Sequence, residues 1–171
     1  MKAITVLEPW ASVIAKGEKK IETRSWATKY RGKIAIHAAK SSKAVDLPQN
    51  FGAIPAYLSL VGPKTSTYLS DDLDLGCVIA IADLVDCRKI IGTKERTVKM
   101  KGTELTETIT IENGIIILDE GMEIDGITEY SLGDYTPGRY AWILENVQRI
   151  KPVPAKGQQR IWTWDESGWE K

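Results

Sequence analysis

Apolar and polar positions alternate along much of this chain, which is the pattern of β-strands with one face buried. The stretches that read as strands are residues 3–7, 20–24, 33–39, 77–87, 139–147 and 161–164. Between the first two, Trp10, Val13 and Ile14 recur at helical spacing after Pro9, and Gly17 supplies a stop. The chain is therefore predicted to contain many short strands and a first helix of about two turns.

Two further stretches are harder to interpret. Residues 41–69 mix Ser, Pro and Gly with apolar residues, and a helix broken near Pro55 or Pro63 fits them. Residues 93–130 contain Asn113-Gly114 between two apolar runs, a strong signal for a hairpin with a type I′ turn. That turn would place Ile111 opposite Ile116 and Ile109 opposite Leu118.

These elements predict an α+β fold, a small and mostly antiparallel β-barrel flanked by a few short helices. We interpret residues 93–130 as a β-rich insertion, a hairpin arm that packs on the main body. The whole chain, residues 1–171, is then expected to be a single domain.

Composition excludes several classes of protein and several kinds of site. No apolar run approaches the roughly 18 residues of a membrane span, and no signal peptide is visible, so we expect a cytoplasmic protein with no membrane partner. Two cysteines and one histidine are too few for a structural zinc site. The glycine-rich loops that hold phosphates or dinucleotides are also missing, so we expect neither a metal nor a cofactor.

The charges cancel overall but are unevenly distributed. Residues 1–40 carry a balance of +6 and residues 135–171 carry +2, whereas residues 71–134 carry −9. If the two ends of the chain lie together, they form a basic face suited to an anionic partner such as nucleic acid. The alternative is that these are ordinary solvated surface charges.

Candidate chemistry is concentrated in the connection after the first helix. Lys19 follows Gly17, and Glu22 and Arg24 lie two apart on the next strand, so these two share one face. Lysine offers a mobile charge to a phosphate, and arginine offers a planar fork. Glu22 would hold a cation in place or act as a general base. The alternative is a surface ion pair that contributes under about 1 kcal/mol.

Aromatic and basic residues follow this group. Trp26 and Tyr30, interleaved with Lys29 and Arg31, form the kind of mixture that binds single-stranded nucleic acid. Trp10 would either stack on a base or anchor the helix on the core.

Three more residues are candidates for the same site. His37 is expected to point away from the face that carries Ile34, Ile36 and Ala38, where it would line a cleft as an acid or base. Arg139 and Lys156 would add positive charge, and Gly157 would permit a close backbone approach.

Several of these motifs resemble the ASCH domain family, including its bacterial and phage members. The resemblance lies in Glu8-Pro9-Trp10-Ala11-Ser12, in the pattern G-x-K-x-x-E-x-R at Gly17, Lys19, Glu22 and Arg24, in Ser25-Trp26 and Tyr30-Arg31-Gly32, in Leu75–Val78 with Leu84–Cys87, in Gly133–Trp142, and in Pro154–Gly157 with Ile161-Trp162.

The resemblance implies a PUA-like β-barrel with a cleft beside the first helix and an association with RNA. Some ASCH members hydrolyse RNA, and a compact branch deacetylates N4-acetylcytidine with the lysine that corresponds to Lys19. In that branch a threonine stands where this chain has Glu22, and the family often has Gln where this chain has Glu8. The insertion at 93–130 also lies outside the usual pattern.

Three functions stay open at this point. The first is an RNA-binding or modified-nucleoside-binding domain, with a site formed by Trp10, Lys19, Glu22, Arg24, Trp26, Tyr30, Arg31, His37, Arg139 and Lys156. The second is a hydrolase at the same cleft, either a metal-independent ribonuclease or an amidohydrolase, with Lys19 and Glu22 as catalytic residues. The third is a module that binds a protein partner through the acidic arm at 93–130.

Overall fold

The computed structural model describes residues 1–41, 73–101 and 106–169. The broken helix considered for 41–69 falls almost wholly outside these residues. In chain order the elements are β1 (Lys2–Val6), α1 (Trp10–Ala15), β2 (Ile21–Arg24), β3 (Gly32–Ala38), β4 (Cys77–Lys101), β5 (Thr106–Leu118), η2 (Asp119–Gly121), β6 (Glu123–Asp125), α3 (Gly126–Glu129), η3 (Tyr130–Leu132), β7 (Tyr140–Pro154) and β8 (Ile161–Thr163).

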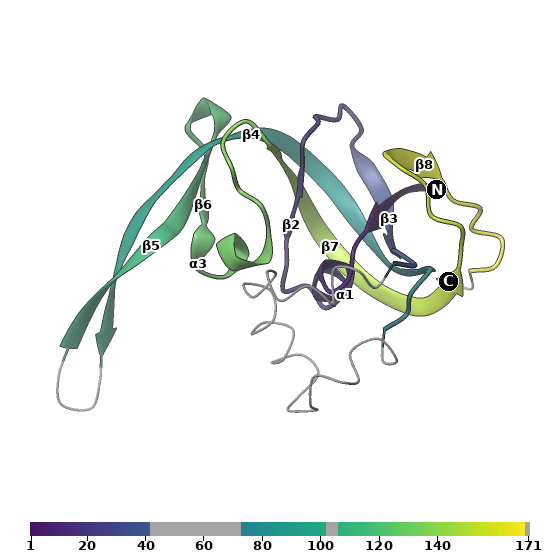
Figure 1. Ribbon diagram of the computed structural model, residues 1–171, viewed down its shortest axis with the longest axis horizontal. Coiled ribbons are helices and arrows are strands. Elements are labelled where there is room, and N and C mark those ends of the chain that lie inside the picture. The colour runs from purple at the N-terminus through teal and green to yellow at the C-terminus, as the bar shows by residue number, and fades with distance from the viewer. Residues whose placement is uncertain (42–72, 102–105, 170–171) are drawn as a thin grey trace. The chain divides into compact units, whose positions relative to one another are not determined.

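The protein is mostly β-strand with a few short helices, which confirms the α+β class (Figure 1). Six strands hydrogen-bond in the order β2-β7-β4-β3-β1-β8, with β5 added to β4 and β6 added to β5. The sheet is mixed, because β1 and β3 are parallel, whereas β8 pairs antiparallel with β1, β4 with β3 and β2 with β7. These pairings form an open sheet, and closure into a barrel stays a prediction.

The chain divides into two compact units, and β4 and β7 each contribute to both. Unit 1 comprises residues 1–20, 30–86 and 144–171, and unit 2 comprises residues 21–29 and 87–143. This division does not coincide with the arm expected at 93–130.

Unit 1 is built around β1 and β3. The two strands run parallel, with Ile4 beside Ile36 and Thr5 beside His37, while β8 pairs with the other edge of β1. Every residue from 34 to 39 is buried, so β3 does not have the single buried face that its sequence predicted. A strand paired on both edges at the centre of a sheet buries both faces, and both then favour apolar residues. The core of this unit joins Ala3, Ala35, Val78, Ile81, Trp162 and Trp164.

Unit 2 contains a short antiparallel pair and a long ribbon. β2 pairs with the start of β7, placing Glu22 beside Trp142 and Arg24 beside Tyr140. The distal part of β4 pairs with β5 along most of their length, as the teal and green strands of Figure 1 show. The core of this unit joins Ile21, Ile90, Ile116, Leu118, Tyr135 and Ala141.

The hairpin predicted at Asn113-Gly114 is wrong. β5 runs through these residues without turning, and Ile116 pairs with Thr93 of β4 instead of with Ile111. A type I′ turn needs positive φ at both central residues, but only Asn113 has it, at 55°. The register between β4 and β5 shifts at this point, because Lys94 faces Ile115 and Arg96 faces Ile111. Asn113-Gly114 therefore forms an irregularity of the bulge type within a continuous strand.

The first helix agrees with its sequence signals. α1 covers six residues, starts directly after Pro9 and buries Ala11, Val13, Ile14 and Ala15. Gly17 follows at φ +78°, with its N–H donating to the Ile14 carbonyl at 2.8 Å, so glycine ends the helix as expected. Among the described residues, no helix has the length and apolar character needed to cross a membrane.

Candidate functional site

The motif lysine follows the end of α1 in unit 1. Lys19 is 1 % exposed, which is unusual for a lysine, and its backbone N–H donates to the Val13 carbonyl at 3.3 Å. The neighbouring Lys20 is exposed. Of these two adjacent lysines, only Lys19, which belongs to the motif, is buried.

A buried carboxyl group lies at the other end of the same helix. Glu8 is fully buried and accepts hydrogen bonds from the backbone N–H of Ser12 at 3.0 Å and from the Ser12 hydroxyl at 2.9 Å. Burial raises the pKa of Glu8, and the nearby charge of Asp74 adds to the increase, while the Ser12 hydrogen bonds and Arg149 oppose it. The sequence offered one signal for this residue, the glutamate in a position where ASCH domains often have Gln.

His37 and Lys156 lie together in a pocket of unit 1. The pocket has a volume of about 490 Å³ and is lined by Thr5, His37, Lys40 and the segment Ala155–Gln159. His37 is 1 % exposed and its Nε2 lies 3.0 Å from the Ala155 carbonyl, so this nitrogen carries the proton and donates. Burial lowers the pKa of His37, which keeps the ring neutral near neutral pH.

Other candidates in unit 1 are engaged in local contacts. Tyr30 donates its hydroxyl to the Lys33 carbonyl at 2.5 Å. Arg31 donates to the Tyr30 carbonyl at 2.9 Å and forms an ion pair with Asp86 at 2.8 Å. Trp10 is half-buried at the first position of α1. None of these three side chains belongs to the pocket lining.

In unit 2, the strand that follows the motif lysine carries the acid and the arginine. The Glu22 carboxylate and the Arg24 guanidinium form an ion pair at 3.0 Å, with Glu22 buried and Arg24 half-buried. Arg139 donates to the carbonyls of Thr23 at 3.4 Å and of Asp134 at 3.1 Å. The structure thus brings Glu22 and Arg24 together and attaches Arg139 to the same strand, whereas the expected convergence with Lys19 stays a prediction.

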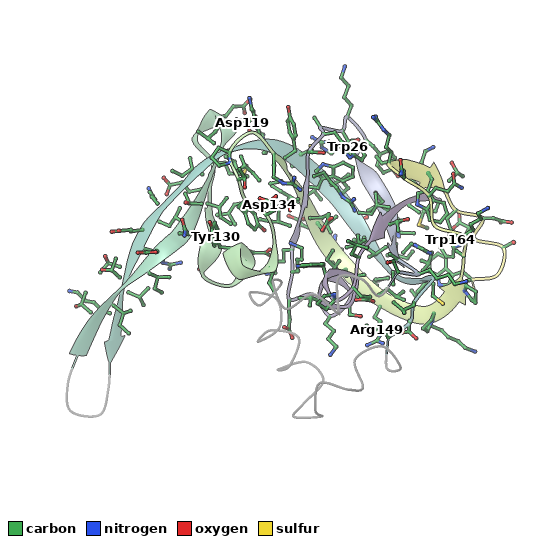
Figure 2. The ribbon with its side chains drawn as sticks, viewed as in Figure 1. Trp26, Asp119, Tyr130, Asp134, Arg149 and Trp164 are labelled. Atoms are coloured by element: carbon green, nitrogen blue, oxygen red, sulfur yellow. The ribbon has the colours of Figure 1, made fainter. Side chains whose placement is uncertain are left out.

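Trp26 is part of the packing of unit 2. Its ring contacts Trp142 edge-to-face at 4.7 Å, and the indole N–H of Trp142 donates to the Trp26 carbonyl at 3.3 Å. Trp142 is fully buried, whereas Trp26 is half-buried and is labelled in Figure 2. Because Trp26 is only half-buried, part of its indole stays accessible, and the residue fits a stacking role as well as a structural one.

A second polar pair in unit 2, Glu129 and Tyr135, was not predicted from the sequence. The Tyr135 hydroxyl donates to the Glu129 carboxylate at 3.0 Å, and both residues are buried. Burial first, and then the charge of Glu129, raises the pKa of Tyr135 well above its ordinary value. Tyr130, labelled in Figure 2, stacks on Tyr135 with ring centres 5.9 Å apart. No spacing rule links residues six apart across a helix end and a loop, so sequence reasoning had no signal for this pair.

The part of the chain that the structure describes contains no set of side chains that could bind a metal ion. Within 1–41, 73–101 and 106–169, no three side chains of the types His, Cys, Asp or Glu gather closely enough to hold an ion. Both cysteines, Cys77 and Cys87, are free thiols.

Comparison with known proteins finds one family model and two curated relatives. The model of the ASCH domain matches residues 4–154. Activating signal cointegrator 1 from Homo sapiens is 33% identical over 84 residues, which cover 49% of this chain and 14% of that protein. The protein of the same name from Mus musculus is 32% identical over a stretch of the same length and coverage. The chain thus aligns with a small part of these relatives, and its match to the family model extends through both units. On this evidence the chain belongs to the ASCH domain family.

Proposed function

We propose that this chain binds RNA, or a modified nucleoside, through the motif G-x-K-x-x-E-x-R at Gly17–Arg24. The observation that carries the proposal is the ASCH family match over residues 4–154, which includes the whole motif. The burial of Lys19 supports it, because a charged group removed from water is retained where it has a specific task. The positive balance of residues 1–40 supports an anionic partner.

Each residue of the motif has a role in this proposal. Lys19 supplies a positive charge to a phosphate or to a polarised base carbonyl. Arg24 supplies a planar fork for a phosphate or a base edge, and Glu22 orients that fork through their ion pair of 3.0 Å.

The remaining candidates contribute stacking and charge. Trp26 and Tyr30 are proposed to stack on bases, a contact that contributes about 1–3 kcal/mol per base. Trp10, Arg31, His37, Arg139 and Lys156 are proposed to complete the binding surface. Arg31 and Arg139 already have carboxylate partners, Asp86 and Asp134, so RNA phosphates would compete with these acids.

The test is a titration of a fluorescent single-stranded RNA of about ten nucleotides with the full chain. One phosphate contact on a single strand changes log K by ~0.7 for each tenfold change in salt, which is a factor of about five in affinity. Arg24→Gln removes one such contact and is therefore expected to weaken binding about fivefold at about 0.1 M salt. Lys19→Gln is expected to weaken it at least as much, with circular dichroism as the check on folding. Lys20→Gln removes the same charge from the exposed neighbour and serves as the matched control. Equal affinity of the wild type, Arg24→Gln and Lys20→Gln would reject the role of the motif.

A second candidate function is hydrolysis at the same motif, and the burial of Lys19 favours it. A lysine shielded from water is the kind that proteins use as a general base or as an electrostatic stabiliser of a developing anion. Water would add to the substrate, either across a phosphodiester of RNA or across the amide of N4-acetylcytidine to release acetate. Incubation of each substrate with the pure chain, followed by mass spectrometry, tests this function. Product formed by the wild type and by Lys20→Gln but not by Lys19→Gln would support it, and no product from the wild type would reject it.

A further inference from the structure

The pocket beside His37 combines positive charge with neutral hydrogen-bonding groups. Lys40 and Lys156 contribute two ammonium groups and are both exposed, and Gln158 and Gln159 contribute two amides. No aspartate or glutamate is among the described residues that line it. Such a pocket favours an anion that also presents donors and acceptors, because each amide offers both a donor and an acceptor.

One wall of this pocket is the segment Ala155–Gln159, and it is held by contacts with Thr5 of β1 and His37 of β3. The Thr5 hydroxyl donates to the Gln158 carbonyl at 2.9 Å and accepts from the indole N–H of Trp162 at 3.2 Å. His37 donates to the Ala155 carbonyl at 3.0 Å, and its ring contacts Trp162 edge-to-face at 5.6 Å. The wall is thus fixed at two points along five residues, which reduces the conformational entropy that a ligand must overcome.

Gly157 brings the backbone of this wall directly against the imidazole. A Cβ atom at this position would lie 2.4 Å from Cε1 and 2.7 Å from Nδ1 of His37, and 2.9 Å from the Thr5 hydroxyl oxygen. Only glycine fits here without displacement of the segment. The pocket is therefore shaped by two strands and a glycine-dependent contact, and its size lies within the range of small-molecule sites of about 300–1,000 Å³.

We propose that this pocket binds one nucleotide of a single-stranded RNA, with its phosphate on Lys40 and Lys156 and its base edge or ribose on Gln158 and Gln159. The inference rests on the proposed RNA binding and adds a second contact point, formed by residues outside the motif. Neither Lys40 nor the two glutamines carried a motif signal in the sequence. They come together because Lys40 is the second residue after β3 and the glutamines precede β8, and these two strands lie on either side of β1.

The test compares two double variants of the full chain in titrations with the same fluorescent RNA at several salt concentrations. Lys40→Gln with Lys156→Gln is expected to weaken binding about 25-fold at 0.1 M salt and to reduce the salt slope by ~1.4, for two lost phosphate contacts. Lys33→Gln with Lys151→Gln removes the same charge from two exposed lysines of unit 1 outside the pocket lining, and is expected to leave the slope within about 0.3 of the wild type.

The imidazole signals of His37, the one histidine of the chain, give a direct reading of occupancy by nuclear magnetic resonance. The RNA is expected to shift these signals in the wild type and in the control pair, but not in the pocket variant. Unchanged affinity and slope in the pocket variant, or an equal loss in both double variants, would overturn the pocket assignment while RNA binding itself stands. A shift of His37 by inorganic phosphate but not by the RNA would also overturn it. Failure of the wild type to bind the RNA at all would instead reject the proposed function.

Discussion

At the scale of single residues, Gly157 is the described glycine of unit 1 at which an added Cβ would lie closest to a side chain. Replacing it with alanine would place a Cβ 2.4 Å from the ring of His37. We expect Gly157→Ala to lower the free energy of unfolding by about 1–3 kcal/mol, the usual cost of inserting a methyl group into a packed site. Chemical denaturation measures this change.

Gly168 provides the matched control in the same unit. A Cβ there would lie 3.8 Å from its nearest neighbour, Val153, which is ordinary contact. Gly168→Ala is expected to stay within about 0.5 kcal/mol of the wild type. Equal stabilities for the two alanine variants would contradict the close approach at Gly157.

His37 makes a pH-dependent contribution to stability. Its folded-state pKa is lowered by burial from the ordinary value of 6.5, so the unfolded chain binds a proton more readily than the folded one. The contribution of His37 is thus fully present above pH 6.5 and is lost as the pH falls through that value toward the lowered pKa. Thermal unfolding at about pH 7.5 and about pH 5.5 should show His37→Gln losing more stability relative to the wild type at the higher pH. A difference that is the same at both values would contradict this account of the buried ring.

At the scale of elements, the start of α1 depends on the buried carboxyl of Glu8. Its raised pKa means that the folded state holds the proton more tightly than the unfolded one, whose pKa is near 4.5. Stability from this group is therefore full below pH 4.5 and falls as the pH rises through the raised value.

Glu8→Gln should remove that loss while keeping an acceptor for the Ser12 N–H. The variant is expected to gain stability relative to the wild type as the pH rises from 4.5 through the raised pKa of Glu8. Glu18→Gln, at an exposed position in the turn after the same helix, is the control and should show no such gain. If the stability difference between Glu8→Gln and the wild type does not change with pH, the carboxyl is not titrating in a buried site.

The irregularity in β5 makes a second element-scale prediction. A Cβ at Gly114 would lie 2.6 Å from Cβ of Arg96 on β4, whereas one at Gly92 of β4 would meet nothing within 4 Å. Gly114→Ala should therefore lower the free energy of unfolding by about 1–3 kcal/mol through the clash across the ribbon. Gly92→Ala should cost no more than about 1 kcal/mol. Denaturation curves that rank the two variants in the opposite order would contradict the observed pairing of β4 with β5.

At the scale of the whole molecule, the sequence predicts elements well where the local signal and the tertiary environment agree. Pro9 and Gly17 delimit α1, and alternating residues locate β1, β2 and β8 to within one or two positions. Asn113-Gly114 failed as a turn signal, because the pairing of β5 along β4 outweighs the local preference of two residues.

The candidate site was predictable only in its local part. The pairing of Glu22 with Arg24 follows from their spacing on one strand, and it is observed. The pocket around His37 joins residues about 120 positions apart, and the Glu129–Tyr135 pair depends on how a helix end packs, so neither follows from local periodicity. The motifs indicated the ASCH family, and the family model matches residues 4–154, which include residues of both units.

The most direct test of the account is photocrosslinking of the full chain to a single-stranded RNA that carries 4-thiouridine, followed by mass spectrometry of the linked peptides. We expect crosslinks within residues 17–31, which hold the motif and Trp26, and within residues 155–159, which form the pocket wall. Both sets should disappear when an excess of unlabelled RNA competes. Crosslinks confined to residues 93–130, or none that the competitor removes, would contradict the claim that this ASCH domain binds RNA through its motif.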